Sequence, residues 1–213
     1  TDVSRGELLH AGAQAAQRPH QQGDEAEARE YAEHHHQHGD DGELSGELVI
    51  LGAHLDHIGT QVDEGEKQVF NGAYDNAMGV ALMLETARAF AALPPRRSVL
   101  FAAVTAEERG LLGSDYFANH PVVPLESIVA NINLDMPLVL YPLADVIAFG
   151  AEHSSLEATV ADAAAKVGFE LSEDPMPEEV LFIRSDQYSF VREGIPSIFF
   201  VAGLRSSDPE IDG

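Results

Sequence analysis

Residues 48–54 read LVILGAH, a short apolar run that ends in a histidine. A run of this length, bounded by polar residues, indicates a buried β-strand. Two further runs of the same kind follow at residues 99–104 and 128–134. Between the first two runs, residues 76–92 carry apolar side chains at the spacing of a helix. Short strands that alternate with longer helices are typical of an α/β domain.

The same alternation continues to the end of the chain, so residues 44–213 are expected to form one folded domain. Apolar patterns predict two more helices, at residues 110–117 and 156–167. They also predict two more strands, at residues 146–149 and 198–201.

Residues 1–43 differ sharply in composition from the rest of the chain. They contain 10 acidic and 3 basic residues but few sizeable hydrophobic side chains. We predict a poorly packed helical or disordered lead-in without a strand, because this segment has little to bury. Its histidine cluster is interpreted as a solvated tract, because nothing nearby would orient the rings on a metal ion. The cluster consists of His34, His35, His36 and His38.

The charge of the sequence restricts its partners. It has 36 Asp and Glu against 12 Lys and Arg, a formal charge of −24. This charge would repel nucleic-acid backbones and anionic lipid surfaces, so we expect cations, metals or small molecules as partners. No apolar run reaches the ~20 residues that a membrane-spanning helix needs. The absence of cysteine excludes a disulfide framework, a cysteine-based zinc site and a cysteine nucleophile.

Polar side chains follow three of the expected strands at the point where each strand ends. His54 and Asp56 follow the first strand, Glu107 and Glu108 the second, and Asp135 the third. In open α/β sheets, functional groups gather at the carboxyl ends of the strands. Each short motif is weak alone, but charged side chains after three successive strands predict a metal site of imidazole and carboxylate donors.

One more carboxylate, Asp75, opens the helix expected over residues 76–92, where it would by itself be interpreted as a helix cap. With Asp75 included, the order His54, Asp75, Glu107-Glu108, Asp135 resembles the co-catalytic zinc aminopeptidases of peptidase family M28. The resemblance covers about residues 47–203. It implies the zinc exopeptidase fold, a three-layer sandwich with a mixed, mainly parallel sheet between helices.

By this resemblance, His54 and Asp135 bind one zinc ion, Glu108 binds a second, and Asp75 bridges the two. Such paired ions lie about 3.5–4 Å apart, so a bridging carboxylate is needed to offset their repulsion. A hydroxide that bridges the metals would attack the peptide bond, because metal lowers the pKa of bound water. Cobalt or manganese would suit the same donors in vitro.

The remaining polar residues of these motifs receive supporting roles. Glu107 is expected to be the general base, which takes the proton of the attacking water and returns it to the departing amine. The carboxylate of Asp56 is expected to orient the ring of His54 through its second nitrogen. His57 is interpreted as a loop residue or as the partner of a ligand. Ser185, Asp186 and Tyr188 resemble a Ser-Asp segment near the family's substrate pocket, although a plain loop fits them equally well.

The sequence departs from the family pattern at both ends of residues 44–213, the expected catalytic domain. The family supplies a late histidine as the last ligand of the Glu108 zinc, but no histidine follows His153 here, and His153 does not match that position. We therefore expect the sequence to lack its C-terminal part, to bind one or two zinc ions and to be weakly active or inert. Relatives also have strands before the His-x-Asp motif, which residues 1–43 do not indicate.

The resemblance predicts an aminopeptidase whose partners are peptides with a free N-terminus. Two alternatives stay open. A glutaminyl cyclase would use a single zinc for intramolecular acyl transfer, and a catalytically dead relative would act as a receptor or binding domain. The pair Glu107 and Glu108 and the presence of four of the five expected ligands favour the peptidase. Because many relatives are exported, we expect a periplasmic or secreted location.

Overall fold

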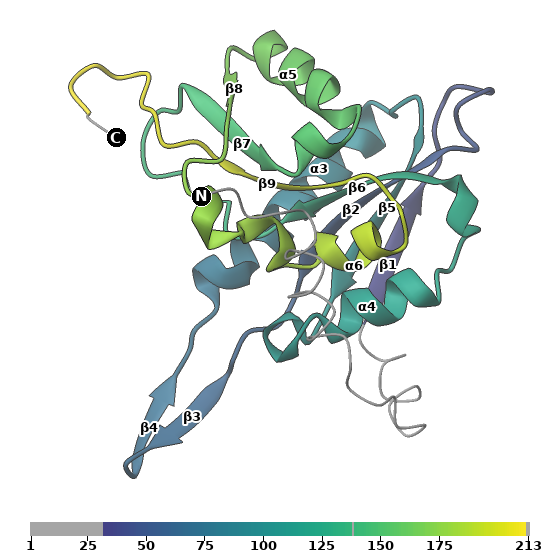
Figure 1. Ribbon diagram of the computed structural model, residues 1–213. Helices are drawn as coiled ribbons and strands as arrows, with labels where there is room; N and C mark the ends of the chain where they lie inside the picture. The colour runs from purple at the N-terminus through teal and green to yellow at the C-terminus, as the bar shows by residue number, and fades with distance from the viewer. Residues whose placement is uncertain (1–31, 138, 212–213) are drawn as a thin grey trace.

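The computed structural model describes residues 32–137 and 139–211, and its centre is a seven-stranded sheet (Figure 1). In chain order the strands are β1 (Ala32–Gln37), β2 (Leu48–His54), β5 (Ser98–Val104), β6 (Ile128–Leu134), β7 (Asp145–Phe149), β8 (Glu170–Ser172) and β9 (Ser197–Ala202). Across the sheet the order is β1-β5-β2-β6-β9-β7-β8. Only the pairs β1–β5 and β7–β9 are antiparallel. The predicted mixed, mainly parallel sheet is confirmed.

Helices cover both faces of this sheet, which makes the structure the three-layer sandwich that the resemblance implies (Figure 1). The α-helices are α3 (Met78–Ala92), α4 (Leu112–Asn119), α5 (Leu156–Lys166) and α6 (Gln187–Arg192). Single helical turns are η3 (Glu107–Arg109), η4 (Leu125–Ser127), η5 (Ala151–His153), η6 (Pro177–Glu179) and η7 (Leu181–Ile183), and η2 (Ala73–Ala77) is a tight turn whose backbone is not helical at Asp75 and Asn76. None of the described helices is long and apolar enough to cross a membrane.

Alternate side chains of β2 pack against the two helical layers. Ile50 is fully buried and belongs to a cluster with Phe117 of α4 and Phe190 of α6. Its neighbour Leu51 belongs to a second cluster with Met83 of α3 on the opposite face. Because both faces of a central parallel strand are covered, its sequence is a continuous apolar run rather than an alternating one.

Every strand and helix predicted between residues 48 and 202 occurs, with ends within two residues of the predicted ones. The hairpin of β3 (Thr60–Asp63) and β4 (Glu66–Val69) was not predicted, and it projects away from the sandwich (Figure 1). All eight strand residues of this hairpin are exposed, so no apolar pattern marks it. Glu64 and Gly65 form its turn, and both have positive φ. The glycine is the sequence signal that could have indicated this turn.

The prediction that residues 1–43 contain no strand is wrong for residues 32–37. Strand β1 pairs antiparallel with β5 at the edge of the sheet, and three residues of the histidine cluster lie in it, His34 to His36. The edge of β5 offers unpaired backbone N–H and C=O groups, and backbone pairing at an edge does not require apolar side chains. The described lead-in is therefore partly sheet, whereas residues 1–31 lie outside the described residues.

The start of α3 is fixed to the end of β6 by one buried amide. The side chain of Asn76 donates to the carbonyl oxygen of Leu134 over 2.9 Å and accepts from the backbone N–H groups of Gly79 and Met136 at 3.1 and 3.2 Å. Gly79 permits this close approach, because a Cβ atom there would overlap both Asn76 and the carbonyl oxygen of Leu134. The contact brings Asp75, which precedes Asn76, next to Asp135, which follows Leu134.

We predict that Gly79→Ala destabilises the protein by about 1–3 kcal/mol, because the backbone of Leu134 cannot yield to the added methyl group. Helix propensity alone would change stability by about 1 kcal/mol in the opposite direction. Urea unfolding followed by circular dichroism measures the difference. The control is Gly46→Ala, where the added Cβ meets nothing within 4 Å. A Gly79→Ala variant as stable as wild type would contradict the packing described here.

Candidate metal centre

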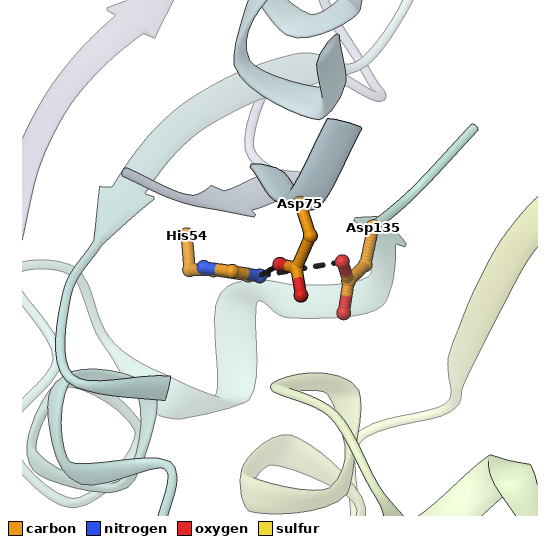
Figure 2. Close-up of side chains that lie close together, drawn as sticks. All are labelled: His54, Asp75 and Asp135. Atoms are coloured by element: carbon orange, nitrogen blue, oxygen red, sulfur yellow. Dashed lines mark hydrogen bonds and ion pairs between the residues drawn. The ribbon is translucent and has the colours of Figure 1, made fainter. Parts of the chain in front are cut away.

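Three predicted metal ligands meet at the carboxyl edge of the sheet (Figure 2). Nε2 of His54 lies 3.1 Å from Oδ1 of Asp75 and 3.2 Å from Oδ1 of Asp135. The three side chains come from the end of β2, from the turn η2 and from the residue after β6. His54 and Asp135 are buried, whereas Asp75 is partly exposed. The predicted convergence of these side chains is thus present in the structure.

The charges around His54 favour a cation. Burial lowers the pKa of His54, but the hydrogen bond to Asp135 and the charges of Asp135, Asp186 and Glu107 outweigh it and raise the pKa to about 9. The pKa of Asp75 is also raised, first by burial and then by the negative charge of Asp135. Asp75 is therefore held at a site where the nearby charge of Asp135 disfavours its ionisation.

The geometry of this group fits a zinc ion. One ring nitrogen of His54 carries at most one proton, yet it faces two carboxylate oxygens. Oδ1 of Asp75 is a buried atom without a hydrogen bond among the described residues. Two donors on one tetrahedral zinc ion, with bonds of about 2.0–2.1 Å, lie about 3.3 Å apart. The separations of 3.1 and 3.2 Å are close to this value.

A second group of donors lies on the other side of Asp75. Nδ1 of His57 is 2.6 Å from Oε1 of Glu108 and 3.6 Å from Oδ2 of Asp75. Asp75 therefore turns one oxygen towards His54 and the other towards His57. Among the described residues, two groups of three side chains could hold a metal ion, because each side chain offers one donor atom within 4.8 Å of the others. The first group is His54, Asp75 and Asp135, and the second is His57, Asp75 and Glu108.

The outer oxygen of Asp135 is held by a chain of buried side chains. Ser185 donates its hydroxyl hydrogen to Oδ2 of Asp135 over 2.7 Å. The side-chain amide of Asn133 in turn donates to Ser185 over 2.8 Å and to Gln187 over 2.9 Å. Because Oδ2 is occupied in this way, Oδ1 is left to face His54. Asn133 and Gln187 were not singled out from the sequence, where each is an ordinary polar residue in a strand or a short helix.

Asp56 supports the site differently from the prediction. The ring atom Nδ1 of His54 makes its hydrogen bond with the backbone oxygen of Asp56 at 3.0 Å, while the Asp56 carboxylate lies 4.0 Å away. That carboxylate instead accepts the backbone N–H of Ala106 over 2.9 Å, immediately before Glu107. The reason is that β2 ends at His54, so the alternation of side chains does not extend to Asp56. Asp56 thus connects the loop after β2 to the turn after β5.

Glu107 is the first residue of the turn η3, where the charges of His54 and Asp135 reach it. Burial, followed by the charge of Asp186, raises the pKa of Glu107 to about 8. Asp186 is itself fully buried, and burial raises its pKa to about 6. Acids whose pKa values are moved towards neutrality are suited to proton transfer. Glu107 is therefore within the electrostatic range of His54, Asp135 and Asp186, and its role as general base stays a prediction.

An apolar cavity of about 310 Å³ opens beside the metal centre. Its wall includes Tyr74 and Met136, which are the chain neighbours of Asp75 and Asp135. The other lining residues are mostly hydrophobic: Leu140, Tyr141, Ile147, Phe149, Pro175, Met176, Leu181, Phe199, Val201, Ala202, Gly203 and Leu204. The three residues predicted near the substrate pocket, Ser185, Asp186 and Tyr188, do not line this cavity. Ser185 and Asp186 are buried instead, and Ser185 contacts Asp135.

Comparison with known proteins identifies relatives of the chain. The model of Peptidase family M28 matches residues 34–210. Aminopeptidase YwaD of Bacillus subtilis is 32% identical over 170 residues, which cover 78% of this chain and 33% of YwaD. The crystal structure of BSAP, a zinc aminopeptidase from Bacillus subtilis, matches with a TM-score of 0.63 and 26% identity, over 84% of this chain and 42% of that chain.

A glutaminyl cyclase from Bacteroides thetaiotaomicron also matches, with a TM-score of 0.58 and 21% identity over 98% of this chain and 80% of that one. At this identity the likeness concerns the fold alone. The chain spans only 33% of YwaD and 42% of BSAP. The match of the family model over residues 34–210 nevertheless covers most of the sequence and confirms the resemblance noted from its motifs. The chain belongs to peptidase family M28.

Proposed function

We propose that this chain is the catalytic region of a zinc aminopeptidase, which hydrolyses the first peptide bond of peptides with a free N-terminus. The observation that carries the proposal is the position of Asp75, whose two oxygens face two separate sets of donors. A carboxylate shared in this way is what a pair of metal ions requires. The aminopeptidases among the matched proteins support the same activity.

In this proposal His54, Asp75 and Asp135 hold one zinc ion, and Asp75 and Glu108 hold a second. When bound, zinc supplies the Lewis acidity that polarises a peptide carbonyl and lowers the pKa of water. Burial raises the pKa of Glu107, and the positive charge of bound zinc would lower it again. The carboxyl would then lie in the range where it can accept and return a proton. Glu107 then takes a proton from the attacking water and delivers it to the departing amine.

One feature of the site suits a peptide with a hydrophobic N-terminal residue. The apolar cavity adjoins the metal centre through Tyr74 and Met136 and is large enough for a hydrophobic side chain. We propose that it receives the side chain of the N-terminal residue. A location outside the cytoplasm stays a prediction.

The alternative of a glutaminyl cyclase rests on the shared fold. A single zinc would need one set of donors, whereas this chain has two sets that share Asp75. This observation supports the peptidase. The presence of the acidic ligands likewise supports an active enzyme over a receptor that has lost its metal site.

Replacing the proposed base tests the reaction directly. We predict that Glu107→Gln lowers kcat for hydrolysis of a leucyl-anilide by about 10²–10⁴-fold, because the amide cannot accept the proton of the water. Zinc content, measured by mass spectrometry, is expected to stay at the wild-type level because Glu107 is not a ligand. Glu126→Gln on the exposed surface is the control. Wild-type turnover by zinc-loaded Glu107→Gln would show that another group is the base.

The pKa of His54 makes zinc binding dependent on pH. With a pKa of about 9 before metal binds, the ring is protonated at neutral pH, and zinc must displace that proton. The apparent association constant should therefore rise with pH up to about 9, by up to tenfold per pH unit. Calorimetry in buffers of different ionisation enthalpy measures the released proton. His120→Ala, at an exposed histidine, should keep this slope, and a constant affinity from about pH 6 to about pH 8 would contradict it.

Filling the cavity should change which N-terminal residue is accepted. We predict that Ala202→Leu lowers kcat/KM for leucyl-anilide by roughly tenfold or more relative to alanyl-anilide, because the added carbons occupy the space of the substrate side chain. The ratio of the two substrates on each protein corrects for any general loss of activity. The exposed Ala158→Leu on α5 is the control. An unchanged ratio in Ala202→Leu would place the side-chain pocket elsewhere.

A further inference from the structure

The outer oxygen of the proposed ligand Asp135 is one end of a chain of four hydrogen bonds. Ser185 donates to Oδ2 of Asp135 over 2.7 Å, and Asn133 donates to Oγ of Ser185 over 2.8 Å. Asn133 also donates to Oε1 of Gln187 over 2.9 Å, and Nε2 of Gln187 donates to the backbone oxygen of Phe182 over 2.6 Å. The three side chains between the two ends are at most 3% exposed, so water does not compete for these bonds.

The backbone oxygen at the far end fixes the direction of every hydrogen bond in the chain. A carbonyl oxygen can only accept, so Gln187 must turn its amide nitrogen towards Phe182 and its amide oxygen towards Asn133. Asn133 must then present its amide nitrogen, whose two hydrogens go to Gln187 and to Ser185. Because the oxygen of Ser185 accepts from Asn133, its single hydroxyl hydrogen goes to Asp135.

We propose that Gln187 is a positioning residue for the metal ligand Asp135, because it makes Ser185 a hydrogen-bond donor to that carboxylate. Gln187 itself does not touch the ion. The inference rests on the proposed function, since it concerns the zinc ion held by His54, Asp75 and Asp135. A carboxylate whose Oδ2 accepts this hydrogen bond cannot rotate freely, so Oδ1 stays directed towards His54, 3.2 Å from Nε2 of the ring.

The effect of losing Gln187 follows from the chemistry of Asn133. Without an acceptor at position 187, nothing fixes which end of the Asn133 amide faces Ser185. The oxygen of that amide is buried and makes no hydrogen bond with any described residue, so turning the amide would give this atom a partner. The hydroxyl of Ser185 would then donate to Asn133 instead of Asp135. The metal ligand thus keeps its hydrogen bond only while Gln187 holds the Asn133 amide in its present orientation.

The carbonyl group that anchors the chain belongs to a tightly packed segment. Phe182 lies in the turn η7, and a Cβ atom at Gly150 would overlap its ring, so the ring lies directly on that glycine. Phe182 also packs against a buried cluster that includes Phe149 and Phe199, two residues of the cavity wall. The orientation of Asp135 is therefore set by the same part of the fold that forms the proposed side-chain pocket.

Zinc titration by calorimetry tests the role of Gln187. The ion in question is the one whose binding is weakened in His54→Ala. Gln187→Met keeps the length of the side chain, but its thioether is only a weak acceptor, so the affinity for this ion should fall about tenfold or more. Gln187→Glu keeps an acceptor for Asn133 and should bind the ion at least as tightly as wild type does.

A double variant separates this role from a general loss of packing. Ser185→Ala removes the donor to Asp135 directly and should weaken the same ion about tenfold or more. Adding Gln187→Met to Ser185→Ala should weaken it no further, because both changes remove the same hydrogen bond. Ser189→Ala is the matched control, since this buried serine of α6 contacts Ser114 at 3.0 Å and lies outside the chain. It should bind zinc as wild type does.

Neutron diffraction of wild-type crystals tests the direction of the chain without any variant, which covers the case that Gln187→Met does not fold. The deuterium of the Ser185 hydroxyl should point at Oδ2 of Asp135, and the amide deuterium atoms of Asn133 should point at Ser185 and Gln187. A hydroxyl deuterium of Ser185 that points at Asn133 would overturn the proposal.

The zinc titrations also separate this inference from the proposed function. Gln187 does not act through Ser185 if Gln187→Met binds the His54-dependent ion with wild-type affinity, or if Gln187→Glu binds it as weakly as Gln187→Met does. The same conclusion follows if the losses in Gln187→Met and Ser185→Ala multiply in the double variant. In each of these cases the proposed function still stands. If wild type binds no zinc ion that depends on His54, the proposed function fails together with the inference.

Discussion

Carboxylates crowd around one buried imidazole at the carboxyl edge of the sheet, and this concentration of like charge is the constraint on which the site depends. Asp75 and Asp135 both approach the same ring nitrogen of His54, and their mutual repulsion is one of the causes that raise the pKa of Asp75. Glu107 experiences the same field and has a pKa of about 8. Such an arrangement is unfavourable by itself and becomes favourable when divalent cations neutralise it.

The fold holds these groups together through hydrogen bonds donated by uncharged side chains. Asn76 links the turn that carries Asp75 to the end of β6, and Ser185 holds the outer oxygen of Asp135. Both side chains are buried, so their hydrogen bonds are not weakened by competition with water. Gly79 allows the helix α3 to come close enough for the Asn76 contact. The positions of the proposed ligands are therefore determined by uncharged neighbours, which keep them in place whatever the charge of the site.

Much of this arrangement can be predicted from the sequence, because strand ends are marked by local patterns. The apolar runs that lead to His54, Glu107 and Asp135 locate the edge of the sheet and the ligands that follow it. Asn76 could not be recognised, since its hydrogen bond to Leu134 joins residues 58 positions apart and leaves no local trace. The proximity of His57 to Glu108 could not be predicted either, because it depends on how two loops pack. Strand β1 was missed because an edge strand needs only backbone partners.

The central claim is that one carboxylate, Asp75, joins two metal sites. A crystal structure of the zinc-loaded protein, with anomalous scattering data at the zinc edge, tests it most directly. The account predicts two anomalous peaks about 3.5–4 Å apart, one on each oxygen of Asp75, with His54 and Asp135 bound to one and Glu108 to the other. A single peak, or zinc bound away from Asp75, would contradict it.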